Sequence, residues 1–251
     1  MANDGIKNEH KIISQLHNHK YEHINNNLQK FLQFIFSFKI SPKERIFSKK
    51  LPGADKSDIC IQINNEKHFI SVKIGSGNSI HQEKLEEFIS FLSKNFEVET
   101  SVLNDIKFFI WGDGTLDGSG KIEERLNARE INKKYPDKVK NIQTFFNFHK
   151  KELIQRFLID GSTNQNNKPE YIYYGNDIEG TYISALDALN WLADKHETNI
   201  SNIPIGKTTF QAWNRNINGG SKSEHKRGEI QVKWGKIGQN IKEIAEGKYG
   251  E

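Results

Sequence analysis

The strongest constraint on the fold comes from two short segments, residues 58–63 and 68–74, in which apolar and polar side chains alternate. Isoleucine or valine occupies every second position within both segments. This period of two is typical of β-strands that bury one face. Two asparagines between the segments favour a turn. We therefore expect a β-hairpin with Asp58 at its start and with Ser71 and Lys73 on one face.

The rest of the chain predicts an α/β protein, because segments with helical spacing are interspersed with further strand-like runs. We expect helices at residues 6–16, 21–38, 80–94 (capped by Ser79), 122–134, 139–158 and 185–195, and further strands at residues 105–111, 171–174, 208–214 and 229–234. The predicted fold is a mixed β-sheet flanked by helices with a C-terminal lobe. A polar loop at residues 162–170 marks the expected boundary between a core, residues 1–165, and that lobe, residues 166–251.

Composition excludes several classes of protein. An apolar content of 35% in 251 residues supports a core, while the apolar run at residues 31–38 is too short to cross a bilayer. The single cysteine, Cys60, excludes an internal disulfide or a zinc finger, and it fits the reducing cytoplasm. The net charge is only +4, but basic residues gather beyond Gly219, which suits a polyanionic partner such as DNA or RNA.

The hairpin carries groups that suit metal-assisted phosphodiester cleavage. That reaction needs hard oxygen ligands for Mg²⁺ and a cation that stabilises the attacked phosphate or orients the water. Asp58 and Lys73 on facing strands supply one group of each kind. Taken singly, Asp58 is equally typical of a turn cap and Lys73 of a surface lysine.

The order Asp58, then Ser71-Val72-Lys73, resembles the active site of the PD-(D/E)xK nuclease superfamily. Ser71 departs from that pattern, because it stands where the family has an acidic residue. Some restriction enzymes of the superfamily with SxK take the missing carboxylate from the following helix. Glu83 is our first candidate for it and Glu86 the second, with Glu87 beside them; the alternative is a solvated helix face.

A second resemblance is to the small monomeric restriction enzymes that cut four-base-pair sites. It rests on DGIKNE (residues 4–9), KSD (residues 56–58), the Val72-Lys73 pair and the segment KIGSGNSIHQE (residues 73–83). The resemblance implies that Glu9, on the first helix, faces the metal centre. It also implies a type II restriction endonuclease that hydrolyses double-stranded DNA with Mg²⁺, acts as a monomer or homodimer, and has a companion DNA methyltransferase.

These resemblances imply a complete set of site residues. The catalytic residues would be Asp58, Ser71, Lys73, Glu83, Glu86 and Glu9, with Asp58, Glu83 and Glu9 as metal ligands. The C-terminal lobe supplies side chains of the types that read base edges or hold phosphates. The expected DNA-binding residues are Gln211, Asn214, Arg215, Lys222, Lys226, Arg227, Gln231 and Lys233.

Three other functions are open to this sequence. A nuclease-like fold that binds DNA without cutting it is suggested by the serine at position 71. A structure-selective repair nuclease would cut branched DNA with little regard to sequence. An NTPase is disfavoured, because Ser201 replaces the first glycine of the P-loop pattern that ends at Gly206-Lys207-Thr208.

Overall fold

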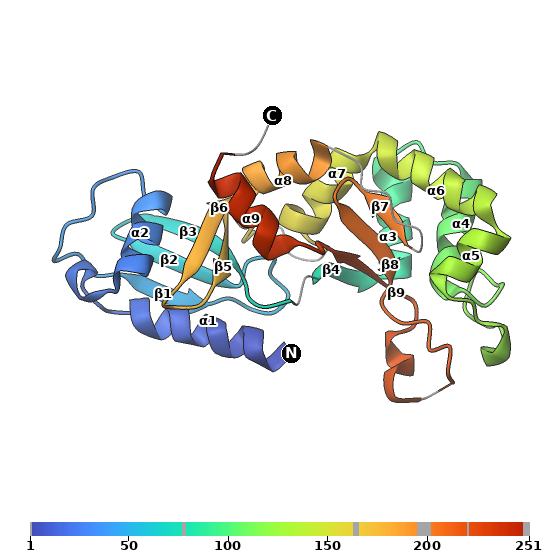
Figure 1. The fold of residues 1–251 in the computed structure, drawn as a ribbon, viewed down its shortest axis with the longest axis horizontal. Coiled ribbons are helices and arrows are strands. Elements are labelled where there is room, and N and C mark those ends of the chain that lie inside the picture. Colours follow the sequence, from blue (N-terminus) through green and yellow to red (C-terminus); the bar gives the residue numbers. More distant parts are fainter. Residues whose placement is uncertain (1, 77–78, 163–165, 195–201, 220, 248–251) are drawn as a thin grey trace. The chain divides into compact units, whose positions relative to one another are not determined.

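The computed structural model covers residues 1–251, and it describes all of them except residues 1, 77–78, 163–165, 195–201, 220 and 248–251 (Figure 1). Its α-helices are α1 (Ala2–Leu16), α2 (Asn26–Ile35), α3 (Leu85–Asn95), α4 (Thr100–Trp111), α5 (Ala128–Lys134), α6 (Pro136–Phe148), α7 (Lys150–Gln155), α8 (Ala185–Asp194) and α9 (Ile237–Ala245). Its strands are β1 (Phe47–Lys50), β2 (Ile59–Ile63), β3 (Glu66–Lys73), β4 (Ser79–Lys84), β5 (Tyr171–Gly175), β6 (Gly180–Ser184), β7 (Ile203–Ile205), β8 (Thr208–Ala212) and β9 (Glu229–Lys233). Short helical turns are η1 (Tyr21–His23), η2 (Ile122–Glu124), η3 (Arg156–Asp160) and η4 (Ser221–Lys226).

The chain divides into two compact units that interleave along the sequence. The first unit contains residues 1–78, 158–191 and 236–251, and the second contains residues 79–157 and 192–235. They do not coincide with the expected ranges, which follow the order of the chain. Each unit has its own β-sheet flanked by helices, so the expected α/β class is confirmed.

The first unit is built on a mixed five-stranded sheet in the order β1-β2-β3-β5-β6. The β3–β5 pair is parallel and the other pairs are antiparallel. The alternation that predicts the β2–β3 hairpin places Ile59, Ile61 and Ile63 in a buried core with apolar side chains of α1 and α2. The expected hairpin is therefore confirmed, and its opposite face carries Cys60 and Phe69 as well as the polar Ser71 and Lys73.

The second unit is built on an antiparallel four-stranded sheet in the order β4-β9-β8-β7. Helices α3, α4, α6 and α7 contact its strands. Four aromatic rings, those of Phe88, Phe146, Phe157 and Phe210, pack against one another beneath the sheet. This aromatic cluster is the centre of the second unit's core.

The expected helix over residues 80–94 is wrong in its first part. Residues 79–84 form the edge strand β4, which pairs with β9, and helix α3 begins only at Leu85. His81 and Glu83 are buried while Gln82 and Lys84 are exposed, as the strand period requires. Ser79 is therefore not the helix cap.

The expected strand over residues 105–111 is also wrong, because this segment lies in helix α4. Its buried residues, among them Val102, Ile106 and Phe109, recur at helical spacing. The helix ends at Gly112, whose φ of 68° is a left-handed conformation that glycine adopts readily.

The other expected helices are shorter or divided. Residues 21–38 form η1 and then α2, whose first turn is capped by Asn25. Residues 122–134 form η2 and α5, and residues 139–158 contain a break at His149 between α6 and α7. The expected elements at residues 6–16, 171–174, 185–195, 208–214 and 229–234 correspond to α1, β5, α8, β8 and β9. Within the described part of the chain, none of these helices is long and apolar enough to span a membrane.

Candidate active site

The hairpin brings Asp58, Ser71 and Lys73 to one place in the first unit. Asp58 directly precedes β2, and its backbone amide donates a hydrogen bond to the Ile70 carbonyl at 2.9 Å. Its carbonyl accepts a hydrogen bond from the Leu51 amide at 3.0 Å. Strands on both sides therefore fix the backbone of Asp58. Ser71 and Lys73 lie at the end of β3, on the face that Asp58 meets.

The Asp58 carboxylate is held by three hydrogen bonds. Its Oδ2 accepts from Ser71 Oγ at 3.1 Å, from the Val72 amide at 2.7 Å and from Lys73 Nζ at 3.2 Å. All three bonds that the described residues make to this side chain end on Oδ2. They leave Oδ1 as the oxygen that can take a metal ion.

The charge of Asp58 follows from these contacts. Burial raises the pKa of its carboxyl, but the Lys73 ammonium, the Val72 amide and the Lys50 ammonium together outweigh burial and lower the pKa. Asp58 is therefore ionised at neutral pH. An ionised carboxylate beside an ammonium is the pair that the sequence predicts for this hairpin.

Glu9 lies in the same unit and is buried, with 7% of the residue exposed. It projects from α1 and forms an ion pair with Lys50, the last residue of β1. The neighbouring Asn8 side chain donates a hydrogen bond to the Gly175 carbonyl at 2.8 Å, which anchors this turn of α1. We refer to Asp58, Ser71, Lys73, Glu9 and Lys50 as the Asp58 centre.

Lys50 is the member of this centre that the sequence does not predict. Its strand, β1, has four residues, and this is too short to show an alternation. The only available signal is the basic pair Lys49-Lys50 just before a loop that leads to Asp58. That signal is weak, because paired lysines are common on protein surfaces.

Glu83, the first candidate for the relocated carboxylate, belongs to the second unit. Its Oε2 accepts a hydrogen bond from Arg156 Nη2 at 2.5 Å, and its Oε1 accepts one from Arg156 Nε at 3.2 Å. His81 Nε2 lies 2.8 Å from the same Oε1. Burial raises the pKa of Glu83, but the hydrogen bonds and charges of His81 and Arg156 lower it overall. This carboxylate is already neutralised, so the arrangement does not favour a metal ligand.

Glu86 and Glu87 also belong to the second unit, on the first turn of α3. Glu86 forms an ion pair with Lys107 at 3.2 Å, and its side chain is largely exposed. Glu87 is exposed as well. The contacts of Glu86 and Glu87 within the second unit therefore do not assign to either residue the role of the acidic group missing at position 71.

The expected DNA-binding residues fall into three groups. Three of them mainly support the second unit: Asn214 donates to the Ser223 carbonyl, Arg215 donates to the Phe109 carbonyl, and Arg227 forms an ion pair with the buried Asp113. Burial lowers the pKa of Arg215, although a guanidinium stays charged at neutral pH. Lys226 forms an ion pair with Glu229, and the Lys222 side chain lies outside the described residues.

The other three, Gln211, Gln231 and Lys233, share one polar face of the second sheet. Gln211 pairs with Gln231 in the β8–β9 register, and its Nε2 donates to Gln231 Oε1 at 2.9 Å. Gln82 of β4 lies opposite Gln231 on the other side. Sequence reasoning missed Gln82, because it was assigned to a helix. These amides form a row of donors and acceptors across three strands.

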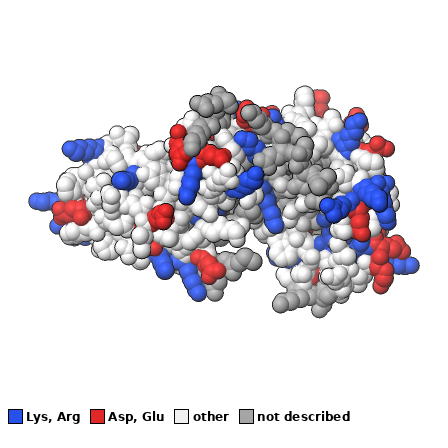
Figure 2. Space-filling model, in the orientation of Figure 1, with Lys and Arg blue, Asp and Glu red and all other residues white. Residues whose placement is uncertain are grey.

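Charge on the face drawn in Figure 2 is mixed. Figure 2 shows basic and acidic side chains interspersed on the visible face rather than gathered into one broad basic patch. This distribution agrees with a net charge of +4. A polyanionic partner would therefore be held by local groups of basic residues, not by the overall charge.

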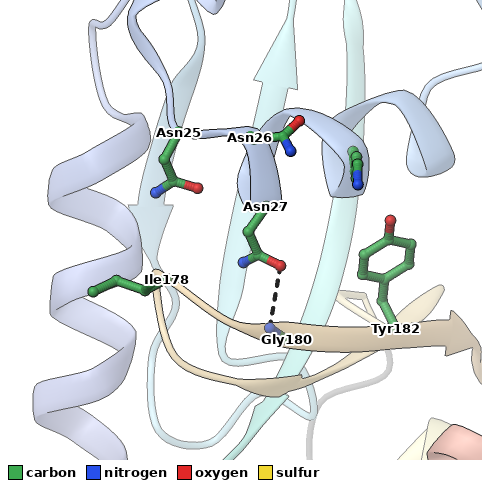
Figure 3. Close-up of a pocket in the computed structure, with 7 residues that line it drawn as sticks. Asn25, Asn26, Asn27, Ile178, Gly180 and Tyr182 are labelled. Carbon is green, nitrogen blue, oxygen red and sulfur yellow. Dashed lines mark hydrogen bonds between the residues drawn. The ribbon is translucent and has the colours of Figure 1, made fainter.

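A polar hollow of about 510 Å³ lies in the first unit between the start of α2 and the β6 strand (Figure 3). Asn27 Oδ1 accepts a hydrogen bond from the Gly180 amide at 3.1 Å, and its Nδ2 donates to Tyr173 Oη at 2.7 Å. Asn25 Oδ1 accepts from the Leu28 amide at 3.0 Å and caps α2. The hydrogen bonds of Asn27 thus hold the helix to the sheet, while Asn25 fixes the helix start.

No family model matches the chain, and no curated protein matches it. Among solved structures, the chain is similar to the restriction endonuclease MspI in complex with its cognate DNA. The sequence identity is 12% and the TM-score 0.44, with 75% of this chain and 70% of MspI covered. At this level of similarity, we base a functional proposal on the side chains of the Asp58 centre.

Proposed function

We propose that the protein is a Mg²⁺-dependent endonuclease that hydrolyses phosphodiester bonds in double-stranded DNA, in the manner of a type II restriction enzyme. The observation that carries this proposal is the contact between Lys73 Nζ and Asp58 Oδ2 at 3.2 Å. It places an ammonium and an ionised carboxylate together where two neighbouring strands meet. The resemblance of Asp58, Ser71 and Lys73 to the PD-(D/E)xK pattern supports the same reaction.

The donor groups of the Asp58 centre fit Mg²⁺. Among the described residues, there is no group of three or more His, Cys, Asp or Glu side chains that could enclose a metal ion. Mg²⁺ does not need one, because it usually binds one or two carboxylates and fills its remaining positions with water and substrate phosphate. Asp58 through Oδ1, and Glu9 from α1, are the residues that would hold it.

Each residue of the centre has a distinct part in the proposed reaction. When bound, Mg²⁺ supplies a Lewis acid for the scissile phosphate and lowers the pKa of a bound water. The hydrogen bonds to Oδ2 hold the Asp58 carboxylate in place. The Lys73 ammonium would donate a hydrogen bond to the attacking water or to the phosphate oxygens on which charge develops. Ser71 fixes Asp58 and adds a neutral oxygen where the family has a carboxylate.

Recognition of the DNA sequence is assigned to the second unit. Amide side chains pair with adenine through one donor and one acceptor, so the row formed by Gln82, Gln231 and Gln211 is suited to reading base edges. Lys233, on the same face, suits a phosphate contact. Asn214, Arg215 and Arg227 are better assigned to holding the loops that frame this face.

The reaction class is tested by cleavage of three substrates with and without Mg²⁺: unmethylated linear phage DNA, supercoiled plasmid and a four-way junction. We expect discrete fragments from the linear duplex only in the presence of Mg²⁺, and loss of those fragments in the variant Asp58→Asn. The matched control is Asp55→Asn, in the loop before β2.

The alternatives give different results in the same experiment. Intact DNA that is nevertheless retarded in a gel would replace the proposal with a binding protein on a nuclease-like fold. Cleavage confined to the junction would replace it with a structure-selective nuclease. Fragments that persist in Asp58→Asn would place the cutting centre elsewhere in the chain.

A further inference from the structure

We propose that Lys50 is a built-in cation that neutralises the Asp58 centre before the metal binds, and that Mg²⁺ must displace its ammonium from Glu9. Lys50 would therefore set the Mg²⁺ concentration at which the enzyme becomes active. This inference rests on the proposed function of the same centre, and it adds a positioning residue that the sequence pattern does not contain.

The first observation is the environment of Glu9. Its side chain is 9% exposed, and the Lys50 ammonium contacts Oε2. An isolated carboxylate at this depth is costly unless a cation accompanies it. Among the described residues, Lys50 is the ion-pair partner of Glu9. The buried carboxylate thus has a counter-ion in the protein itself.

The second observation is the position of Lys50 beside Asp58. Lys50 pairs with Ile59 in the β1–β2 register, and the next residue, Leu51, is hydrogen-bonded to the Asp58 backbone. The register places the Lys50 side chain on the face of Ile59, at the end of the sheet where Asp58 precedes β2. Its charge also acts on Asp58, where it helps to lower the pKa of the carboxyl. One ammonium serves both of the carboxylates that we assign to the metal.

Competition between the ammonium and the metal follows from charge. Two carboxylates that are to share a divalent cation repel each other without it, and a lysine whose charge acts on both relieves that repulsion. Mg²⁺ gains less from a site that is already neutralised, because it must first release the ammonium. The Lys50 side chain is 31% exposed, so it has solvent into which to move. The flexible stem of a lysine allows this movement without a change in the backbone.

Metal affinity, measured without DNA, tests the inference directly. We expect the variant Lys50→Met to bind Mg²⁺ about tenfold more tightly than the wild type in isothermal titration calorimetry at pH 8. Lys50→Arg keeps the cation and should bind Mg²⁺ like the wild type. Lys49→Met is the matched control, because Lys49 is the exposed neighbour that pairs with Cys60 instead.

The possible outcomes separate this inference from the proposed function. Unchanged or weaker Mg²⁺ binding by a folded Lys50→Met would overturn the role of Lys50 while leaving the metal site intact. No Mg²⁺ binding by the wild type, or binding that survives Asp58→Asn unchanged, would overturn both. Circular dichroism and thermal unfolding establish that the variants are folded; if Lys50→Met is not, Lys50→Gln takes its place in the titration.

Discussion

Replacing Lys73 with alanine is expected to lower the rate of DNA cleavage by about 10²- to 10³-fold, because the ammonium next to the attacked phosphate acts mainly in the transition state. Single-turnover cleavage at saturating Mg²⁺ measures this rate. DNA binding with Ca²⁺ in place of Mg²⁺ should change little, since one half-buried lysine contributes modestly to a phosphate interface. Stability should fall by no more than about 1 kcal/mol.

The matched control for this variant is Lys67→Ala on the same strand. Lys67 lies on the same face of β3 as Lys73 but near its other end, where its ammonium lies over the Phe69 ring. We expect cleavage by Lys67→Ala at the wild-type rate. Wild-type cleavage by Lys73→Ala would contradict the role assigned to Lys73.

The largest effect on stability is expected from Arg156→Met. This change leaves the fully buried Glu83 carboxylate without its guanidinium, and breaking a buried pair in this way costs about 3–5 kcal/mol. Urea unfolding measures the loss. The double variant that adds Glu83→Leu removes both charges, and it should recover much of the stability. A loss below about 1 kcal/mol in Arg156→Met would show that this pair does not support the second unit.

The same pair predicts a dependence on pH. The pKa of Glu83 is lower in the folded protein than its ordinary value of 4.5. A carboxyl whose pKa is lower in the folded than in the unfolded protein stabilises the folded state at pH values above its unfolded pKa. This stabilisation is lost as the pH falls through the folded pKa. The difference in unfolding free energy between the wild type and Arg156→Met should therefore narrow as the pH falls below 4.5. A difference that stays constant down to pH 3 would contradict this account of Glu83.

The sequence predicts the β2–β3 hairpin well, because its information is local. The alternation of Ile59, Ile61 and Ile63 with polar residues is sufficient to define a strand with one buried face. The turn then fixes which residue faces Asp58. The contact between Asp58 and Lys73 is therefore predictable from spacing alone.

The segment from Ile80 to Lys94 shows where local reasoning fails. Apolar residues there fit a helix throughout, but residues 79–84 pair with β9, a strand about 145 residues further along the chain. Pairing between strands so far apart in the sequence overrides the local preference for a helix, and the spacing of apolar residues does not reveal it. Separation along the chain also hides the partner of Glu83, because Arg156 is 73 residues away. The sequence thus makes Glu83 a reasonable candidate for a metal ligand, whereas in the fold Glu83 is the ion-pair partner of Arg156.

The most direct test of the central claim is the location of the metal. A crystal grown with DNA and Mn²⁺, which prefers the same carboxylate oxygens as Mg²⁺, would give an anomalous peak at the ion. We predict a peak within about 2.2 Å of Asp58 Oδ1, with Lys50 no longer in contact with Glu9. A peak bound to Glu83, or a peak that touches neither Asp58 nor Glu9, would contradict the proposed active site.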